Sequence, residues 1–114
     1  MRHLKKKKIG RGMDQRRKLM RALASSAILY ERIETGYANA RALKPHLEKL
    51  ITRAKEDTLH NRRQLLSKLT RNAANKAIEV LGPKFKSRTG GYVRIIKLTH
   101  PQSGQSKAVV EFVE

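Results

Sequence analysis

The chain has 114 residues, 27 of them Lys or Arg and 9 Asp or Glu, so its formal net charge at pH 7 is +18. It contains no cysteine, which excludes disulfides, thiolate metal sites and cysteine nucleophiles, and no apolar run approaches the ~20 residues that span a bilayer. Because the length is typical of one domain and the N-terminus lacks the apolar stretch of a secretory signal, we expect an unprocessed, soluble, single-domain protein of the cytoplasm or an organelle matrix.

The first 13 residues are predicted to form an extended basic arm. Residues 1–21 hold ten basic side chains against Asp14 alone, and residues 1–13 combine a run of four lysines with two glycines and no sustained periodicity. Such a charge density becomes favourable beside a polyanion, where each neutralised phosphate releases counterions. We therefore expect the arm to be disordered in solution and to order on nucleic acid. A solvated tail that only aids solubility is the alternative.

Residues 14–35 predict a helix followed by a short strand. Asp14 is a candidate helix N-cap, and the apolar residues after it recur at helical spacing as far as Ile28. Residues 31–35 alternate polar and apolar side chains, as half-buried strands do. Ser25 and Ser26 lie among alanines within the helix, which favours a role in close packing over a role as nucleophiles.

Three more helices are predicted between residues 37 and 83. The second helix is either kinked at Pro45 or begins near it, because proline removes a backbone hydrogen bond. Thr58 is the candidate cap of the third helix and Asn72 of the fourth, and Gly82-Pro83 is a stop signal for the fourth. The apolar stripes of these helices predict a core that includes Leu47, Leu50, Leu65 and Ile78.

The C-terminal quarter predicts a β-hairpin. Two runs rich in β-branched residues, 92–98 and 107–113, flank the turn-forming segment 100–106. An isolated hairpin is only marginally stable, so we expect residues 31–35 to join it as a third strand. The predicted fold class is α+β, with about four helices packed on one face of a small three-stranded sheet that ends in the C-terminal hairpin. Residues 1–13 would form the arm and residues 14–114 the single domain.

No pattern typical of an enzyme or a metal site is present in the sequence. The four histidines lack a second ligand at zinc-finger or i, i+4 spacing, so we expect no metal and no cofactor. The acids are scattered, and their one adjacent pair, Glu56-Asp57, is more typical of a helix end than of a nuclease. Gly10-Arg11-Gly12 follows no strand, which argues against a phosphate loop. We therefore expect neither catalysis nor a small-molecule substrate.

Two further segments are candidates for contact with nucleic acid. Residues 60–64 place five donor-bearing side chains near the start of the third predicted helix, although an exposed polar face explains them equally well. In residues 82–94, basic groups alternate with other residues through a turn-prone loop. Gly90 and Gly91 permit close approach of the backbone, and Tyr92 or Arg94 could stack on an unpaired base or sugar. The alternative is a core position for Tyr92 and an ordinary turn at the glycines.

The candidate RNA-binding residues come from the arm, the first helix and these two segments. All but three are Arg or Lys, the side chains that neutralise phosphate. They are Arg2, His3, Lys5, Lys6, Lys7, Lys8, Arg11, Arg16, Arg17, His60, Arg62, Arg63, Lys84, Lys86, Arg88, Tyr92 and Arg94.

Seven segments, in order from the first residue to the last, resemble the family of bacterial ribosomal protein seventeen of the large subunit. They are MRH at 1–3, RIET at 32–35, LKP at 43–45, EKLIT at 48–52, HNRR at 60–63, GGYVRIIKL at 90–98 and VVEFVE at 109–114. The resemblance implies an α+β fold and assembly onto 23S ribosomal RNA near the outer end of the peptide exit tunnel. It also implies ribosomal proteins twenty-two and thirty-two as neighbours.

The final hairpin loop departs from this resemblance. Relatives often have a longer loop with a basic pair, a Gly-Asp step and Ala-Pro, whereas residues 100–106 of this chain contain no acid. Any contact made by the family's loop is therefore not carried over to this chain.

Three classes of function remain in competition. The first is a structural RNA-binding protein of the large ribosomal subunit, anchored by the arm and the two segments. The second is an architectural DNA-binding protein, which would also be small and basic, although the sequence lacks a dimeric recognition helix and an apolar wedge on a basic ribbon. The third is an RNA-modifying enzyme, which the lack of a catalytic pattern disfavours.

Overall fold

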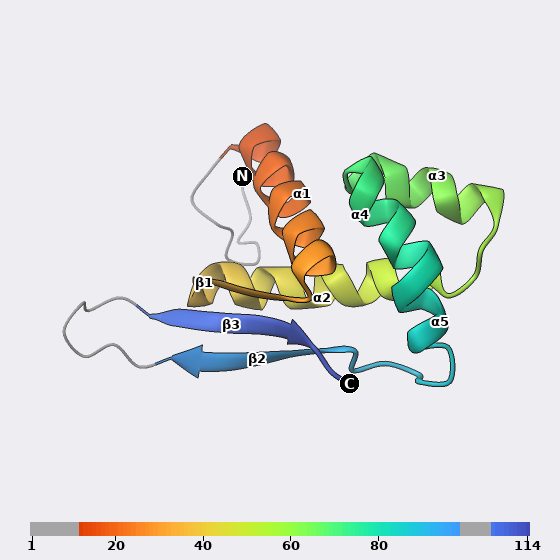
Figure 1. Ribbon diagram of the computed structural model, residues 1–114. Coiled ribbons are helices and arrows are strands. Elements are labelled where there is room, and N and C mark those ends of the chain that lie inside the picture. The colour runs from red at the N-terminus through yellow and green to blue at the C-terminus, as the bar shows by residue number, and fades with distance from the viewer. Residues whose placement is uncertain (1–11, 99–105) are drawn as a thin grey trace, which may run out of the picture.

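The computed structural model describes residues 12–98 and 106–114 of the chain. The fold is α+β, as predicted: α4, η1 and α5 run on without a break, so the described residues form four helical segments and one three-stranded sheet (Figure 1). The elements in chain order are α1 (Met13–Tyr30), β1 (Arg32–Gly36), α2 (Tyr37–Ala54), α3 (Leu59–Lys68), α4 (Arg71–Lys76), the π-helical turn η1 (Ala77–Leu81), α5 (Gly82–Lys84), β2 (Val93–Leu98) and β3 (Lys107–Phe112).

The sheet has the strand order β1-β3-β2, and both strand pairs are antiparallel. Val110 in the middle of β3 lies opposite Ile33 of β1 and Ile95 of β2. The predicted hairpin and its third strand are therefore both confirmed. Because β3 has a partner on each side, it is the most deeply buried strand, whereas β1 has no fully buried residue.

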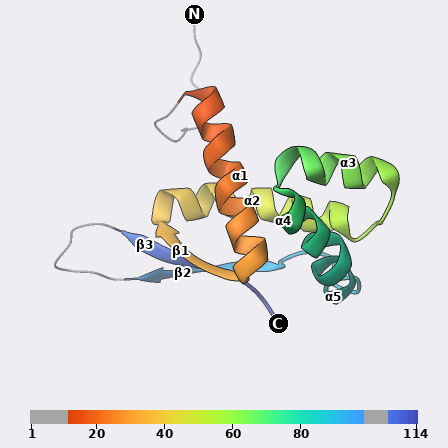
Figure 2. The same cartoon turned by 45° about the horizontal axis from the view of Figure 1, so that its top comes forward.

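Helix α2 lies at the centre of the core. It contacts all three strands, as well as α1, α3 and η1. The predicted core residues Leu47, Leu50, Leu65 and Ile78 are all buried. Leu66, which neighbours Leu65 on α3, is instead 43 % exposed. Figures 1 and 2 show α1 rising from the sheet, with α3 and α4 beside it near the far end of α2.

Two of the three predicted helix caps are wrong. Helix α1 begins one residue before Asp14, with Gly12 at the N-cap position and no side-chain cap. Helix α4 is capped by Thr70 and not by Asn72: Thr70 Oγ1 accepts a hydrogen bond from the Ala73 N–H at 3.4 Å. The backbone N–H of Thr70 donates to Ser25 Oγ at 3.0 Å, which holds the start of α4 against α1. Thr58 caps α3 as predicted, accepting from the N–H of Asn61.

The predicted stop at Gly82-Pro83 is also wrong, because the helix continues to Lys84. Gly82 keeps helical dihedral angles, and a Cβ atom built on it would lie 2.5 Å from the carbonyl oxygen of Ala54 at the end of α2. Glycine at this position therefore permits two helices to approach closely. Helix α2 begins at Tyr37 and runs through Pro45, so the alternative that it begins near this proline is wrong.

Candidate nucleic-acid interface

Tyr92 lies in the core and not on the surface. Its side chain is 1 % exposed and its ring packs against Phe85, with the ring centroids 5.3 Å apart. The hydroxyl donates to the carbonyl of Arg88 at 3.3 Å and accepts from Lys55 Nζ at 2.9 Å, a contact that lowers the pKa of the phenol. A buried ring offers no free face to a base, so the prediction that Tyr92 stacks on RNA is wrong and the core alternative is correct.

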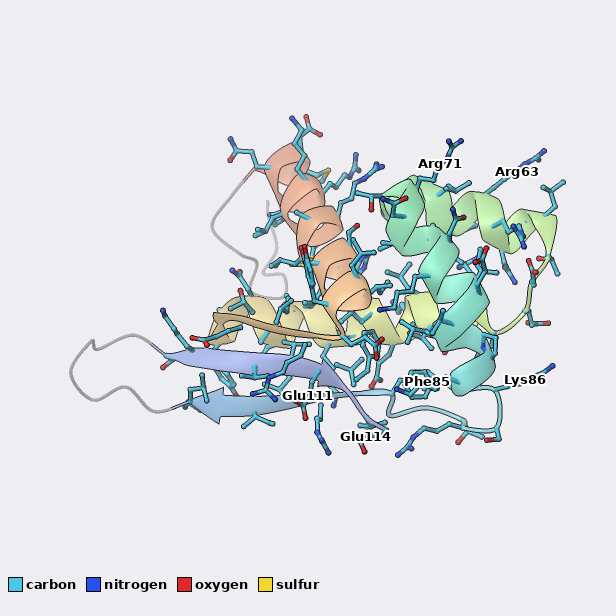
Figure 3. The ribbon with its side chains drawn as sticks, viewed as in Figure 1. Arg63, Arg71, Phe85, Lys86, Glu111 and Glu114 are labelled. Carbon is cyan, nitrogen blue, oxygen red and sulfur yellow. The ribbon has the colours of Figure 1, made fainter. Side chains whose placement is uncertain are left out.

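The loop between α5 and β2 is tied to the end of α2 by Lys55. Besides the phenol, Lys55 Nζ donates to the carbonyl of Arg88 at 2.5 Å. Gly91 has a φ of +65°, a left-handed conformation that favours glycine, so the turn itself explains this residue. With its backbone held in this way, the loop exposes the side chains of Lys86 and Arg88. Figure 3 shows Lys86 extending away from the protein.

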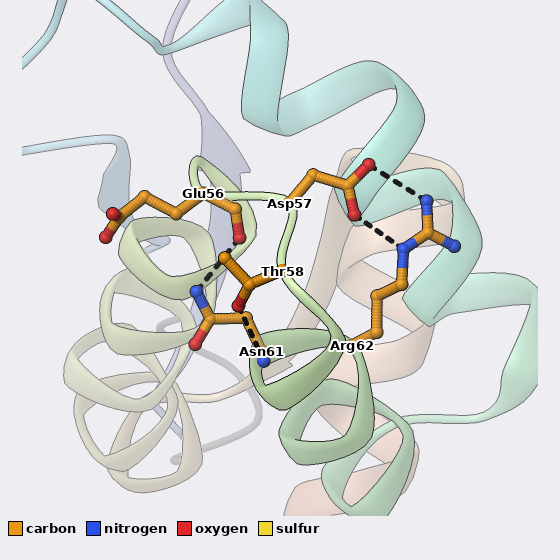
Figure 4. Close-up of polar contacts among 5 residues, drawn as sticks. All are labelled: Glu56, Asp57, Thr58, Asn61 and Arg62. Atoms are coloured by element: carbon orange, nitrogen blue, oxygen red, sulfur yellow. Dashed lines mark hydrogen bonds and ion pairs between the residues drawn. The ribbon is translucent and has the colours of Figure 1, made fainter.

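The turn between α2 and α3 is organised by hydrogen bonds among five neighbouring residues (Figure 4). Asn61 Nδ2 donates to the carbonyl of Glu56 at 2.9 Å, while its N–H donates to Thr58. Arg62 binds both carboxylate oxygens of Asp57, at 2.5 and 2.9 Å, and this guanidinium holds the pKa of Asp57 below its usual value. The acidic pair lies between the end of α2 and the start of α3, and its Asp57 engages Arg62 within the protein.

His60 and Arg63 lie on the same helical turn as Arg62, and all three side chains are exposed. Neither forms an ion pair with a carboxylate of the described chain. In Figure 3 the side chain of Arg63 extends away from the protein surface. These two residues thus fit a contact with an external partner better than Arg62 does.

Glu111 bridges two arginines across the sheet. Arg94 Nε of β2 lies 2.5 Å from Glu111 Oε2, and Arg32 of β1 lies 2.6 Å from Glu111 Oε1. The register places both arginines directly opposite Glu111, so each strand contributes one charge to the same row. The two guanidinium groups, Arg94 foremost, hold the pKa of Glu111 below its usual value. The charge of Arg94, one of the predicted site residues, is therefore partly neutralised within the protein.

Lys84 is the third predicted site residue with an internal acidic partner. Its ammonium lies 3.8 Å from Glu31, which also pairs with Lys76 at 2.9 Å. Glu31 has a φ of +63° at the end of α1, and these two lysines, Lys76 foremost, lower the pKa of its carboxyl.

Arg16 and Arg17 of α1 lie at a groove that the sequence pattern does not predict. They line it together with side chains of α2 and α3. The other residues that line the groove, which were not among the predicted RNA-binding residues, are Lys18, Met20, Arg21, His46, Ser67 and Lys68. Lys18 and Arg21 belong to the basic cluster of the first 21 residues. His46 and Lys68 carry no signal in the sequence, because packing alone brings their helices beside α1.

The predicted contacts of the arm lie outside the described residues. These are Arg2, His3, Lys5, Lys6, Lys7, Lys8 and Arg11. Within residues 12–98 and 106–114, no group of three His, Asp or Glu side chains is placed to hold a metal ion. No helix in these ranges combines the length and the apolar composition needed to cross a membrane.

The chain is similar in sequence to many known proteins of one family. A sequence model described as Ribosomal protein L17 matches residues 19–113. A large ribosomal subunit protein bL17 of a Hydrogenobaculum species is 48 % identical, over the full length of both chains. The protein of the same name from a Sulfurihydrogenibium species is 43 % identical over 100 % of this chain and 98 % of its own. That of Thermodesulfovibrio yellowstonii is 43 % identical over 92 % of this chain and 80 % of its own.

Proposed function

The chain belongs to the ribosomal protein L17 family, a structural and non-enzymatic component of the large ribosomal subunit, and we propose that it binds 23S ribosomal RNA there and stabilises the RNA fold. The proposal includes a position on the side of the subunit where the peptide exit tunnel opens, in cytoplasmic ribosomes. Ribosomal proteins twenty-two and thirty-two are the proposed protein neighbours. Residues 1–13 act as an RNA-binding arm of the single domain formed by residues 14–114.

The carrying observation is the exposure of basic side chains that no acid of the protein neutralises. Arg63, Lys86 and Arg88 are exposed, and no ion pair joins them to a carboxylate within the described ranges. An excess of exposed cations repels itself in the free protein and becomes favourable beside phosphates. These three residues and His60 are therefore the strongest surface candidates outside α1. The contacts of Arg62, Lys84 and Arg94 are proposed as weaker, since each already has an acidic partner.

The test compares three polyanions at the same salt concentration. The full chain is titrated with 23S ribosomal RNA, with duplex DNA of equal length and with RNA of unrelated sequence, and the three dissociation constants are measured by filter binding. We expect tighter binding to 23S ribosomal RNA than to either alternative. Equal affinity for all three would reduce the interaction to non-specific charge and overturn the proposal. Preference for duplex DNA would instead support the architectural DNA-binding function.

A further inference from the structure

A groove of about 440 Å³ separates α1 from the end of α3. The N-terminal half of α1 forms one wall, α2 contributes His46, and the last residues of α3 complete the site. Figures 1 and 2 show this part of α1 and the C-terminal end of α3 on the same side of α2, far from the loop that carries Lys86. The groove is therefore a separate region from the surface formed by that loop.

The lining of the groove is rich in cations and contains no acid among the described residues. Arg16, Arg17, Lys18, Arg21 and Lys68 line it, and among the residues that the structure describes it has no Asp or Glu in its lining. No ion pair of the described chain joins Lys18, Arg21 or Lys68 to a carboxylate. Glu31, Asp57 and Glu111 pair with cations elsewhere in the described chain, so Lys18, Arg21 and Lys68 leave an excess of positive charge at the groove.

A second hollow in the protein is nearly neutral. It measures about 670 Å³ and lies between α2, the turn that follows it and the 89–92 segment. Glu48 and Glu56 line it together with Lys49 and Arg53. Its charges largely cancel. This hollow is therefore the less favourable site for an anion, although it is the larger of the two. The smaller groove is the one whose electrostatics favour negative charge.

His46 reports on the field inside the groove. Its burial, and after that the nearby charges of Lys68 and Lys49, lower the pKa of the imidazole. Burial disfavours charge of either sign, so only the contributions of Lys68 and Lys49 reflect the positive field at His46. Like-charged side chains held close together also destabilise the free protein. A ligand that neutralises these charges explains why the protein keeps such a cluster.

We propose that this groove holds a segment of the sugar–phosphate backbone of ribosomal RNA, with Lys18, Arg21 and Lys68 in contact with phosphates. The inference rests on the proposed function and adds a binding region to it. Arg17 and Arg21 are four residues apart, so α1 presents cations on successive turns, about 6 Å apart along its axis, and Lys68 adds a charge from the other wall. A chain of consecutive phosphates uses all of these charges, whereas a single small anion would use a part of them.

The first test maps RNA near the groove by directed cleavage. The natural chain has no cysteine, so Ser67→Cys places a unique thiol at the exposed rim of the groove, to which an iron–EDTA reagent is attached. The matched control is Ser106→Cys, an exposed serine beside β3. With each labelled full chain bound to 23S ribosomal RNA, hydroxyl radicals from position 67 are expected to cut a short run of nucleotides that position 106 does not cut. Cleavage from position 67 no stronger than that by untethered reagent would overturn the proposal.

The second test compares two double variants with the same change in charge. Lys18→Gln with Lys68→Gln removes two lysines of the groove, and Lys97→Gln with Lys107→Gln removes two exposed lysines of the hairpin. The groove variant should bind 23S ribosomal RNA more weakly than the hairpin variant. Its slope of log affinity against log salt should flatten by roughly 0.7 to 0.9 for each phosphate that the protein no longer neutralises. Its melting temperature at low salt should equal or exceed that of the parent, because repulsion has been relieved.

The outcomes separate the groove from the function as a whole. Equal affinities and slopes for the two double variants, with tight binding of the parent to 23S ribosomal RNA, would overturn the groove site and leave the proposed function standing. Failure of the parent itself to prefer that RNA would remove both. A groove variant that melts well below the parent would also contradict the proposal, since it would assign a structural role to these lysines.

Discussion

At the scale of single residues, Tyr92 connects the 85–92 loop to α2 through its hydroxyl and Lys55. The variant Tyr92→Phe keeps the ring but leaves the Lys55 ammonium with one acceptor fewer. We expect the free energy of unfolding to fall by ~0.5 to 1.5 kcal/mol, the usual net value of a hydrogen bond. Tyr92→Leu also loses packing against Phe85 and should cost more. Urea denaturation followed by circular dichroism measures both effects.

The affinity of the folded Tyr92→Phe protein for 23S ribosomal RNA provides the control. It should match that of the parent, because the hydroxyl is turned to protein groups. A clear loss of RNA affinity at unchanged stability would show that Tyr92 contacts RNA after all.

Glu111 predicts a dependence of stability on acid pH. Because Arg94 and Arg32 lower the pKa of Glu111 from its ordinary 4.5, the folded protein holds this proton less well than the unfolded chain. The stabilisation is complete above the unfolded pKa and is lost as the pH falls through the folded pKa. Glu111→Gln should therefore be less stable than the parent at pH 7, and the difference should shrink steadily below about pH 4.5. Thermal melts at a series of pH values test this, and a gap that stays constant down to pH 2 would contradict it.

At the scale of helices, Gly82 sets the distance between α5 and the end of α2. A Cβ atom at this position would lie 2.5 Å from the carbonyl oxygen of Ala54, so Gly82→Ala must push the helices apart. We expect a loss of ~1 to 3 kcal/mol, typical of overpacking. Gly90→Ala is the matched control, since a Cβ atom there meets nothing within 4 Å, and its stability should change by less than about 1 kcal/mol. Similar effects of the two substitutions in chemical denaturation would show that the close approach is not required.

Helix α3 offers adjacent leucines that differ in burial. Leu65 is fully buried and Leu66 is 43 % exposed. Leu65→Ala should lower the free energy of unfolding by ~2 to 5 kcal/mol, because it leaves a cavity in the core. Leu66→Ala should have a much smaller effect, since its side chain is partly in contact with water in the folded protein. Equal losses for the two variants in the absence of RNA would mean that the orientation of α3 is wrong.

At the scale of the whole molecule, the attraction of a polyanion depends on which basic side chains, among those that give the net charge of +18, lack an acidic partner. Glu31, Asp57 and Glu111 engage lysines or arginines within the described ranges. The basic residues without such partners therefore determine where a polyanion is attracted most strongly. In the described ranges they include Lys18, Arg21 and Lys68 at the groove beside α1, and Lys86 and Arg88 in the exposed loop beyond α5.

The arm is predicted to contribute affinity and not stability. Deletion of residues 2–11 removes its lysine run but keeps Gly12, whose carbonyl accepts from the N–H of Arg16 at the start of α1. The melting temperature should stay nearly unchanged, while affinity for 23S ribosomal RNA falls. The slope of log affinity against log salt should flatten by roughly 0.7 to 0.9 for each phosphate that the arm no longer neutralises. An unchanged salt slope in filter binding would instead identify the arm as a solvated tail.

Features that depend on neighbouring residues were determined by the sequence itself. The net charge and the lack of cysteine are enough to limit the classes of function. Apolar spacing predicted the helices and the burial of Leu47 and Leu65, and β-branched runs predicted the hairpin. Thr58 was identified as a cap because its hydrogen bond reaches no farther than Asn61. Periodicity and capping act within a few residues, so their patterns can be read along the chain.

Features that depend on contacts between distant residues were decided by the tertiary structure. Thr70 caps α4 because its N–H is held by Ser25, 45 positions earlier in the chain. Gly82 is required inside its helix because Ala54 lies against it, and Tyr92 is buried because Phe85 and the end of α2 enclose it. The basic groove likewise exists because three helices bring their cations to one place. Such contacts leave no local pattern in the sequence, since each is set by how separate elements pack.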